Sequence, residues 1–359
     1  MNRDTPLLRF HCGRDAFGET ICTELEWLSP KKPVGYRNLT DFLLLRQAPK
    51  HRKHMAELLE RYGCPDTEGF LRLTHALSLN DTLWVRETGS ALRWDEVSLY
   101  RNPFDELIAR AAFDGEFSGT SFSSTSPEFG TDGLFAKCWV REEDGIFLYK
   151  SGSSTFEIEP LSEYLACQVA RRLKLKQVEY DLAFYHGKLV SKCRLFTDER
   201  VGLVKARDLA GREEHTISAL LRLFDSIGEG DTFRRMCVLD ALILNTDRHL
   251  GNFGVLTDNE SGELLGMAPV FDHNRSLLYD MDERQLERTD WCIGTCRPRI
   301  GTDFIAAARG LLTEEIRRDL SEMRDFSFEQ HPGIRADENR LSLLSRVVRR
   351  QTERILGNS

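Results

Sequence analysis

Three polar residues near the middle of the chain have the types and separations that phosphoryl transfer requires. Asp247 and Asn252 have four residues between them in the segment NTDRHLGN, and Asp272 follows twenty residues after Asn252. Phosphoryl transfer needs a carboxylate that orients the attacking hydroxyl, oxygen ligands for a metal ion on the triphosphate, and a cation on the phosphates. Asp247 would be the base, and Asn252 and Asp272 would bind magnesium, which prefers oxygen ligands.

The predicted elements around these residues would bring them together. Residues 233–244 are apolar on nearly all sides, which predicts a buried helix leading into NTDRHLGN. The next stretch, residues 253–271, predicts two strands joined by a turn at 259–262, and the apolar residues 268–271 would place Asp272 at the strand end. This return of the chain would set Asp272 beside Asn252, so that the two could share one magnesium ion.

Each of these residues also has an ordinary structural explanation. Asp and Asn frequently cap helices and begin turns, so any one of the three alone would indicate nothing. A buried helix, the D-x-x-x-x-N spacing and an Asp at a strand end are less common together, and the combination favours catalysis. His249, in the same segment, is grouped with the catalytic residues. Its predicted role is loop support rather than proton transfer, because Asp247 already serves as the base.

A cation for the phosphates is found upstream. Lys150 ends the apolar strand IFLYK, and Glu163 lies on the helix that follows. This is the order in which kinases place a phosphate-binding Lys and the Glu that fixes it. Alone, a Lys at a strand end is usually solvated and a Glu in a first helical turn is common. Gly133, in the loop 130–137, would help to cover the phosphates, although its glycine signal is weak.

Hydrophobic periodicity divides the chain into three regions. Residues 1–112 form a mostly helical leading region of unknown role, with a helical pattern from about residue 37 and one apolar face on Met55, Leu58 and Leu59. Residues 113–199 begin with a Gly-, Ser- and Thr-rich loop. They then predict a hairpin (134–140 and 146–150), a helix (161–173) and two strands (182–185 and 188–196) around the turn His186-Gly187.

Residues 200–359 are predicted to be largely helical. Apolar spacing marks a helix from Ile217 to Ile227, and the arginines of 341–356 are expected on the solvated face of a surface helix. The fold class is therefore α+β and bilobal, with a small β-containing N-lobe at 113–199, a helical C-lobe at 200–359 and a helical leading domain. ATP would lie between the lobes, with 192–196 as the connecting segment near the adenine.

Composition excludes several classes of function. A net charge of −8 over 359 residues argues against a protein that grips a nucleic-acid backbone. The start lacks the apolar run of a signal peptide and no stretch reaches the length of a membrane span, so we expect a cytoplasmic protein. Nine irregularly spaced cysteines predict reduced thiols. P-loop, Rossmann, GxSxG and HExxH motifs are absent from the sequence.

The segment NTDRHLGN is similar to the N-x-D-x-H-x-x-N loop of HipA-like serine/threonine kinases, which are related in fold to the phosphatidylinositol kinases. The resemblance covers residues 118 to 300. It implies a bilobal kinase fold with Asp247 as base, Asn252 and Asp272 on magnesium, and Lys150 on the ATP phosphates. Residues 133–137 have the Gly and Lys separation of the phosphate-covering loop in such kinases. It further implies protein Ser/Thr phosphorylation, autophosphorylation, and a toxin-antitoxin setting with an antitoxin-like partner.

The acceptor cannot be chosen from the loop, because protein and lipid kinases share it. Between residues 273 and 299 five arginines stand against five acids, which is a poor cluster for a polyanionic inositol headgroup, so a protein acceptor is preferred. A phosphoinositide kinase is the alternative. A catalytically silent kinase-like binding or scaffold protein is the alternative of another class, although no metal ligand or base is missing. Thr131 and the serines within 118–126 are candidate autophosphorylation sites.

Overall fold

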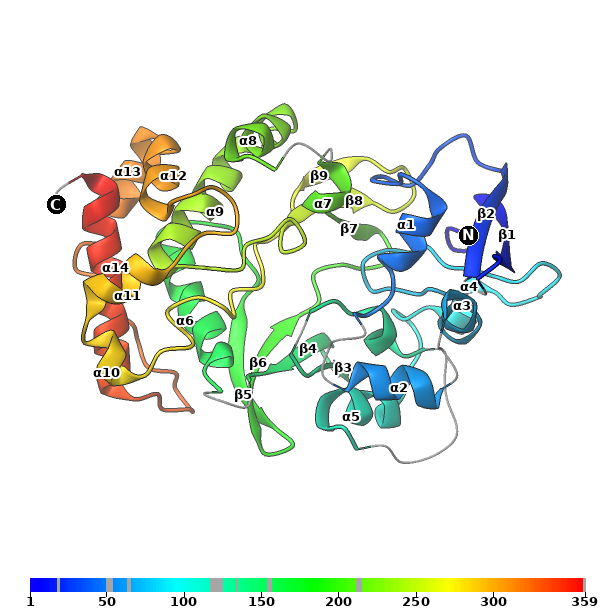
Figure 1. The fold of residues 1–359 in the computed structure, drawn as a ribbon, viewed down its shortest axis with the longest axis horizontal. Helices are drawn as coiled ribbons and strands as arrows, with labels where there is room; N and C mark the ends of the chain where they lie inside the picture. The colour runs from blue at the N-terminus through cyan, green and yellow to red at the C-terminus, as the bar shows by residue number, and fades with distance from the viewer. Residues whose placement is uncertain are drawn as a thin grey trace. The chain divides into compact units, whose positions relative to one another are not determined.

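The structure is a computed structural model that describes residues 1–17, 20–49, 54–62, 66–116, 125–133, 135–153, 157–210 and 215–357. The chain divides into two compact units, whose helices and strands are labelled in Figure 1. Unit 1 comprises Met1–Lys150, Leu195–Val204 and Leu256–Leu265, and unit 2 comprises Ser151–Arg194, Lys205–Val255 and Gly266–Ser359. These divisions fall at other residues than 112/113 and 199/200, and the assignment of lobes stays a prediction.

Unit 1 begins with a β-hairpin that the periodicity of the leading region did not predict. Strand β1 (Leu8–Arg14) pairs antiparallel with β2 (Thr20–Trp27), and Cys12 stands directly opposite Cys22. Their Cα atoms are 4.1 Å apart and the two sulfurs form a disulfide. The prediction of reduced thiols is therefore wrong for this pair, because the strand register that brings two distant cysteines together cannot be read from their spacing.

Short helices make up most of the rest of unit 1. They are α1 (Leu39–Leu44), α2 (Met55–Arg61), α3 (Thr67–Thr74), α4 (Trp94–Val97), α5 (Glu106–Asp114) and the 3-10 turn η1 (Pro127–Gly130). Side-chain caps fix several starts, as where Asp105 accepts hydrogen bonds from the N–H groups of Leu107 and Ile108. Met55, Leu58 and Leu59 are buried, which confirms their predicted apolar face.

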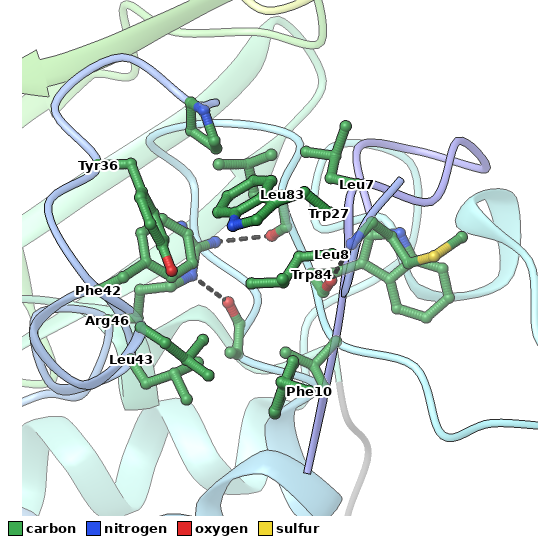
Figure 2. A pocket seen from close by; sticks show the side chains of 15 residues that line it. Leu7, Leu8, Phe10, Trp27, Tyr36, Phe42, Leu43, Arg46, Leu83 and Trp84 are labelled. Atoms are coloured by element: carbon green, nitrogen blue, oxygen red, sulfur yellow. Dashed lines mark hydrogen bonds between the residues drawn. The ribbon is translucent and has the colours of Figure 1, made fainter. Parts of the chain in front are cut away.

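A cavity in unit 1 has walls from the hairpin, from α1 and from residues 76–85 (Figure 2). Aromatic and aliphatic side chains line most of it, among them Trp27, Tyr36 and Trp84. The Arg46 guanidinium in the wall donates to the Leu83 carbonyl at 2.7 Å and pairs with Asp81 at 2.7 Å. Because these donors are directed into the protein, the cavity presents mainly apolar surface.

The hairpin expected after the Gly- and Ser-rich loop is present. Strand β3 (Lys137–Glu142) pairs antiparallel with β4 (Gly145–Ser151), which confirms the predicted strands and the turn between them. The register places Lys137 directly opposite Lys150. Directly opposite residues project from the same face of a sheet, so this hairpin brings two lysines together.

Unit 2 opens with the predicted helix and strand pair. Helix α6 (Glu159–Arg172) carries Pro160 in its first turn. A backbone N–H there would have no partner within the helix, so the missing N–H of proline costs no hydrogen bond. Strands β5 (Tyr180–Tyr185) and β6 (Lys188–Arg194) pair antiparallel around His186-Gly187. Both turn residues have positive φ, 47° and 75°, as a two-residue hairpin turn of type I′ requires.

The middle of the chain supplies the buried helix on which the loop 245–252 is mounted. Strand β7 (Val201–Lys205) and helix α7 (Ala206–Leu209) precede α8 (Ile217–Ser226) and α9 (Gly230–Ile243), which confirms both predicted helices. The rings of Phe224 and Phe233 stack at 5.1 Å, with Phe253 5.8 Å from Phe224. These contacts join α8, α9 and the residue that follows the loop into one core.

The two strands predicted after the loop are β8 (Gly254–Asp258) and β9 (Leu264–Met267). The predicted strand structure through residues 268–271 is wrong, because β9 ends at Met267. That segment makes a single bridge, in which Val270 N–H donates to the Lys176 carbonyl at 3.0 Å and the Val270 carbonyl accepts from Val178 at 2.9 Å. Pro269 has no N–H for a ladder, so the pairing does not extend.

Five helices complete unit 2: α10 (Glu283–Leu286), α11 (Thr289–Thr295), α12 (Phe304–Gly310), α13 (Glu314–Ser321) and α14 (Glu338–Leu356). Within 341–356, where solvated arginines were expected, Arg346 is exposed and the other arginines are half-buried. Arg340, just before that range, is different. Arg340 is 2% exposed and donates to the carbonyls of Met281 and Leu278 at 2.8 and 3.2 Å. Within the described ranges, no helix is long and apolar enough to cross a membrane.

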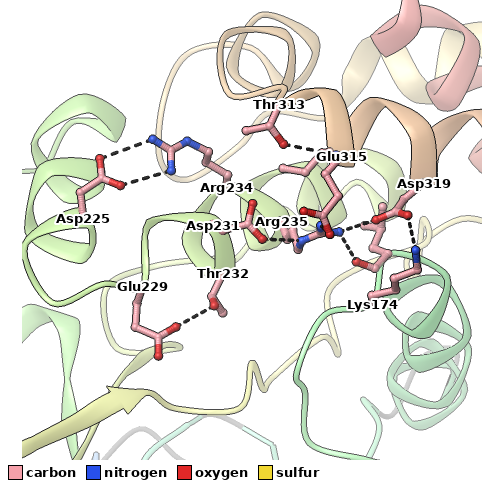
Figure 3. Close-up of polar contacts among 12 residues, drawn as sticks. Lys174, Asp225, Glu229, Asp231, Thr232, Arg234, Arg235, Thr313, Glu315 and Asp319 are labelled. Atoms are coloured by element: carbon pink, nitrogen blue, oxygen red, sulfur yellow. Dashed lines mark hydrogen bonds and ion pairs between the residues drawn. The ribbon is translucent and has the colours of Figure 1, made fainter.

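A buried ion-pair network joins three helical segments of unit 2 (Figure 3). Asp319 on α13 is fully buried and accepts from Arg235 on α9 and from Lys174, just after α6, each at 2.6 Å. Arg235 also pairs with Asp231 at 2.7 Å and Glu315 at 2.8 Å. Burial favours the neutral carboxyl, but the bonds from Lys174 and Arg235 outweigh it and lower the pKa of Asp319.

We predict that Asp319→Asn lowers the free energy of unfolding at neutral pH by about 3 to 5 kcal/mol, because it leaves Arg235 buried without its central anion. The folded pKa of Asp319 lies below its unfolded value. The contribution is therefore complete above about pH 4 and is lost as the pH falls through the folded pKa. Urea unfolding at pH 7 and at successively lower pH measures the difference from wild type.

Asp225→Asn is the matched control, because Asp225 forms an exposed pair with Arg234 in the same region (Figure 3). This substitution should cost less than about 1 kcal/mol at any pH. Equal losses for the two variants, or a loss for Asp319→Asn that stays constant down to low pH, would contradict the assigned role of the network.

Candidate active site

Arg248 organises the loop that sequence reasoning singled out. Its side chain is 4% exposed, and the guanidinium pairs with the Asp240 carboxylate of α9 at 3.0 Å. Its remaining N–H groups donate to the Asn252 carbonyl at 2.9 Å, the Phe271 carbonyl at 2.5 Å and the His273 ring at 3.0 Å. A guanidinium has five N–H donors, and all five are used here.

Asp240 is the anion beneath the loop. Burial raises the pKa of this carboxyl, and the Arg248 charge and its hydrogen bonds oppose that rise. Asn245 donates to Asp240 Oδ1 at 3.1 Å and accepts from the Asp247 N–H at 3.0 Å. Asp240 thus fixes the loop both through Arg248 and through Asn245, which holds the backbone of Asp247.

Hydrogen bonds inside the loop position the side chains at its surface. The Asn252 amide nitrogen donates to the Asp247 carbonyl at 2.9 Å, so its Oδ1 is the atom that would ligate a cation. His249 Nδ1 accepts from Gly251 N–H at 3.0 Å, and His249 N–H donates to the Asp247 carbonyl at 2.7 Å. His249 therefore contributes to the turn of the loop, and its exclusion from proton transfer stays a prediction.

Asp272 follows Phe271, whose carbonyl is held by Arg248. Its φ of 62° lies in the left-handed region, which non-glycine residues occupy only where neighbouring contacts impose it. One such contact is the bond from Asp272 N–H to the Tyr180 hydroxyl at 3.0 Å. Burial and the charge of Glu163 are the leading causes that raise the pKa of Tyr180 well above its usual value, so the phenol stays protonated.

Glu163 on α6 is buried and accepts a hydrogen bond from Ser191 on β6. It lies in unit 2, whereas Lys150 lies in unit 1, and the predicted pairing of the two stays a prediction. His273, also buried, accepts from Arg248 on Nδ1. Because a guanidinium only donates, the neutral ring carries its proton on Nε2.

Two arginines lie near the Asp247 carboxylate, one beside each of its oxygens. Arg275 Nε is 3.9 Å from Oδ2 and Arg299 Nε is 3.8 Å from Oδ1. Both distances exceed a hydrogen bond, and the Asp247 side chain is 22% exposed. The carboxylate is therefore held near two cations without being saturated by them, and it is accessible to a hydroxyl.

Gly133 and Lys150 lie in unit 1, together with Lys137, which is opposite Lys150 on β3. Gly133 has a φ of 101°, and a Cβ there would lie 2.2 Å from Lys137 Nζ. The Lys137 ammonium donates to the Asp132 carbonyl at 2.7 Å. A side chain at position 133 would therefore require the Lys137 ammonium to move, and both lysines are 4% exposed.

The chemistry of the donor set fits magnesium better than a structural metal. Among the residues that the structure describes, no three His, Cys, Asp or Glu side chains gather into a metal-binding group. The candidate ligands are one carboxylate, Asp272, and one amide oxygen, from Asn252. Such a short oxygen set suits magnesium, which keeps water and substrate phosphates as its other ligands.

Sequence reasoning missed Arg248, Asp240, His273 and Lys137. Arg248 stood inside the motif, but an arginine in a polar loop is usually exposed. Asp240 offered a signal that could have been used, since it is an acid in an otherwise apolar helix. Lys137 entered the sequence analysis only through its separation from Gly133, and its position opposite Lys150 follows from the β3–β4 register.

We predict that Arg248→Met destabilises the chain by about 3 to 5 kcal/mol, because Asp240 is left buried without its cation. Adding Asp240→Leu should restore much of that stability, since no unpaired charge remains. It should not restore order in residues 245–252, because the Asn252 and Phe271 carbonyls still lack their donor. Urea unfolding measures the first effect and amide hydrogen exchange the second. Wild-type protection of the loop in the double variant would show that the guanidinium does not organise it.

Comparisons with known proteins agree with the motif. No protein-family model matches the chain. Over 136 residues the chain is 31% identical to the serine/threonine-protein kinase CtkA of Helicobacter pylori (strain J99), covering 34% of this chain. The chain spans 42% of the length of this curated relative.

Two solved structures are similar. A crystal structure of the Helicobacter pylori proinflammatory kinase CtkA matches with 19% identity and a TM-score of 0.47, over 61% of this chain and 91% of that one. The HipA, HipB and operator DNA complex of the Shewanella oneidensis MR-1 toxin-antitoxin system matches at 14% identity and a TM-score of 0.54, covering 97% and 95%. This second likeness concerns the fold alone. The resemblance of the chain to HipA-like serine/threonine kinases, first seen in its catalytic-type loop, is thus confirmed by comparison of sequence and of fold.

Proposed function

We propose that this chain is a protein serine/threonine kinase that uses ATP and magnesium, with Asp247 as the base that orients the acceptor hydroxyl. One observation carries the proposal. Arg248 donates hydrogen bonds to both the Asn252 and the Phe271 carbonyl, and the Asn245 side chain accepts one from the backbone N–H of Asp247. These contacts support the proposal, because they connect the segments that carry the proposed base and the two proposed metal ligands to one buried framework, and catalysis by positioning requires such a framework.

The residues of the candidate site also suit the binding of ATP with magnesium. Bound ATP supplies the phosphoryl group, and magnesium neutralises charge on its phosphate oxygens. Asn252 Oδ1 and the Asp272 carboxylate would hold the ion, and Lys150 and Lys137 would hold phosphate oxygens. Gly133, whose missing side chain leaves room for the Lys137 ammonium, would let backbone N–H groups approach the phosphates.

Asp247 would accept a hydrogen bond from the acceptor hydroxyl and hold its proton as the oxygen attacks. The hydrogen bond from Asn252 to the Asp247 carbonyl would hold Asn252, the proposed metal ligand, at a fixed position relative to Asp247, the proposed base. His249 would support the turn between them. Residues 192–196, as the connecting segment near the adenine, and Glu163, as the partner of Lys150, remain parts of this proposal.

A protein acceptor is favoured by the similarity to CtkA, a serine/threonine-protein kinase by its name. Autophosphorylation and an antitoxin-like partner remain expectations from the family resemblance. Of the candidate autophosphorylation sites, residues 118–124 lie outside the described chain. The Thr131 hydroxyl donates to the Pro127 carbonyl at 2.7 Å and accepts from Trp139 Nε1 at 2.9 Å, so its modification would first require these bonds to open.

The direct test offers labelled ATP and magnesium with protein and phosphoinositide acceptors in separate reactions. We expect transfer to protein by the wild type, and a loss of about a hundredfold or more in kcat for Asp247→Ala, because the base orients the hydroxyl. Asp272→Ala should remove metal-dependent transfer. Glu260→Gln, an exposed acid of the β8–β9 turn, should leave activity unchanged.

The outcomes separate the alternatives. Transfer only to phosphoinositides would identify a lipid kinase instead. Nucleotide binding without transfer to any acceptor or to the chain itself would identify a silent kinase-like protein. Transfer that survives both Asp247→Ala and Asp272→Ala would overturn the assigned site.

We further predict that Gly133→Ala weakens nucleotide binding by about tenfold, because its Cβ would push the Lys137 ammonium from its place. Fluorescent-nucleotide titration measures the dissociation constant. Gly187→Ala is the matched control, since Gly187 also has positive φ but would bring its Cβ within 4 Å of nothing. Both variants should lose similar stability from backbone strain, and only Gly133→Ala should lose affinity. Equal affinities in the two would contradict a phosphate-binding role for this loop.

A further inference from the structure

The backbone of Asp272 is held by a side chain that has no part in the proposed chemistry. Its N–H donates to the Tyr180 hydroxyl at 3.0 Å, and its φ of 62° lies in the left-handed region. The residues on either side are held by Arg248, which donates to the Phe271 carbonyl at 2.5 Å and to the His273 ring at 3.0 Å. Three successive residues are thus fixed, and Tyr180 holds the one that carries the proposed metal ligand.

The Tyr180 hydroxyl accepts a bond that a continued strand pairing would give to a carbonyl. Val270 N–H donates to the Lys176 carbonyl at 3.0 Å, and the Val270 carbonyl accepts from Val178 N–H at 2.9 Å. In a parallel pairing the next N–H, that of Asp272, would donate to the Val178 carbonyl. It donates to the Tyr180 hydroxyl instead, and the chain turns at this residue. The conformation of Asp272 is therefore set by a side chain at the point where the pairing ends.

The segment that carries Tyr180 is tied to helix α6 at Cys167. The Cys167 thiol donates to the Val178 carbonyl and accepts from the Tyr180 N–H, with its sulfur 3.5 and 3.4 Å from the two atoms. Burial raises the pKa of this thiol to about 12, so it keeps the proton that it donates. The Cys167 carbonyl also accepts from the Gln177 side chain at 3.0 Å. Three hydrogen bonds therefore join residues 177–180 to one position on α6.

The same face of α6 carries Glu163, four residues before Cys167. Glu163 is buried and accepts from Ser191 on β6, while Cys167 holds the start of β5. Helix α6 thus positions both strands and, through Tyr180, the backbone of Asp272. A displacement of α6 would move Tyr180, and Tyr180 would move Asp272.

We infer, resting on the proposed kinase function, that Tyr180 is a positioning residue whose hydroxyl holds Asp272 in the conformation that binds the metal ion, with Cys167 holding Tyr180. A left-handed conformation is unfavourable for a residue with a Cβ, so Asp272 keeps it only while its neighbours impose it. Without the hydroxyl the carboxylate populates other orientations as well. The metal must then select the competent one, which lowers its affinity rather than the rate of transfer once it is bound.

The test measures metal binding directly and separately from turnover. Mn²⁺ is titrated by electron paramagnetic resonance into the protein with a non-hydrolysable ATP analogue, and the KM for Mg²⁺ is measured in transfer assays. We expect Tyr180→Phe to weaken Mn²⁺ binding and to raise the KM for Mg²⁺, each by about tenfold, while kcat at saturating Mg²⁺ falls by less than about threefold. Amide hydrogen exchange at Asp272 should become faster in this variant.

Tyr100→Phe is the matched control, because the Tyr100 hydroxyl also bonds a backbone group, the Leu79 carbonyl of unit 1, at 2.8 Å. Both Phe variants should lose similar stability in urea unfolding, and only Tyr180→Phe should lose metal affinity. Cys167→Ala should weaken Mn²⁺ binding by about threefold, because Tyr180 loses one of its supports. Cys167→Ser should retain it, since a hydroxyl can donate and accept at the same place.

The outcomes separate this inference from the kinase proposal. Unchanged Mn²⁺ binding by Tyr180→Phe, or equal losses in the two Phe variants, overturns the inference and leaves the kinase proposal standing. Equal losses from Cys167→Ala and Cys167→Ser overturn the link to α6. A wild type that binds Mn²⁺ with the analogue but transfers phosphate to no acceptor overturns the kinase proposal, whereas weaker Mn²⁺ binding by Tyr180→Phe would still support the inference. A wild type that binds no Mn²⁺ in the presence of the analogue overturns both.

Discussion

The buried pair of Arg248 and Asp240 is the interaction on which the candidate site depends. A charged guanidinium inside a protein is costly unless every donor is used, and here the carboxylate takes one side while two carbonyls and an imidazole take the others. The two carbonyls belong to segments that carry Asn252 and Asp272. The cost of burying charge is thus offset by contacts that also fix the relative positions of the site residues.

Buried charge recurs in unit 2 with a different effect. Asp319 joins α13 to α9 and to the end of α6, and Arg340 holds the carbonyls of Leu278 and Met281 just after the segment that bears Arg275. These contacts are directional, unlike apolar packing, so they specify how helices and irregular segments meet. The helical part of the chain therefore supports a loop-built site through a small number of saturated ionic contacts.

Local pattern was enough to predict the elements whose neighbours lie close in sequence. The hairpin at β3–β4, the turn at His186-Gly187 and helix α9 were predicted because their signals are periodic and contiguous. The D-x-x-x-x-N spacing likewise singled out Asp247 and Asn252. Other features depend on strand register or on burial, which cannot be predicted from residue spacing alone. They are the Cys12–Cys22 bridge, the role of Arg248 and the position of Lys137 opposite Lys150. Pro269 has no N–H to donate to a strand pairing, and the apolar pattern of its neighbours does not show this effect.

The hydrogen bond from the Asn252 amide nitrogen to the Asp247 carbonyl bears on which residue type the position can hold. Aspartate has the same shape and would be the stronger ligand for a divalent cation. It offers only acceptors at neutral pH, however, and would set a carboxylate oxygen against the carbonyl oxygen that now receives an N–H. An amide at position 252 therefore suits the backbone around Asp247, and a cation bound at the proposed site would have the weaker of two oxygens as its ligand.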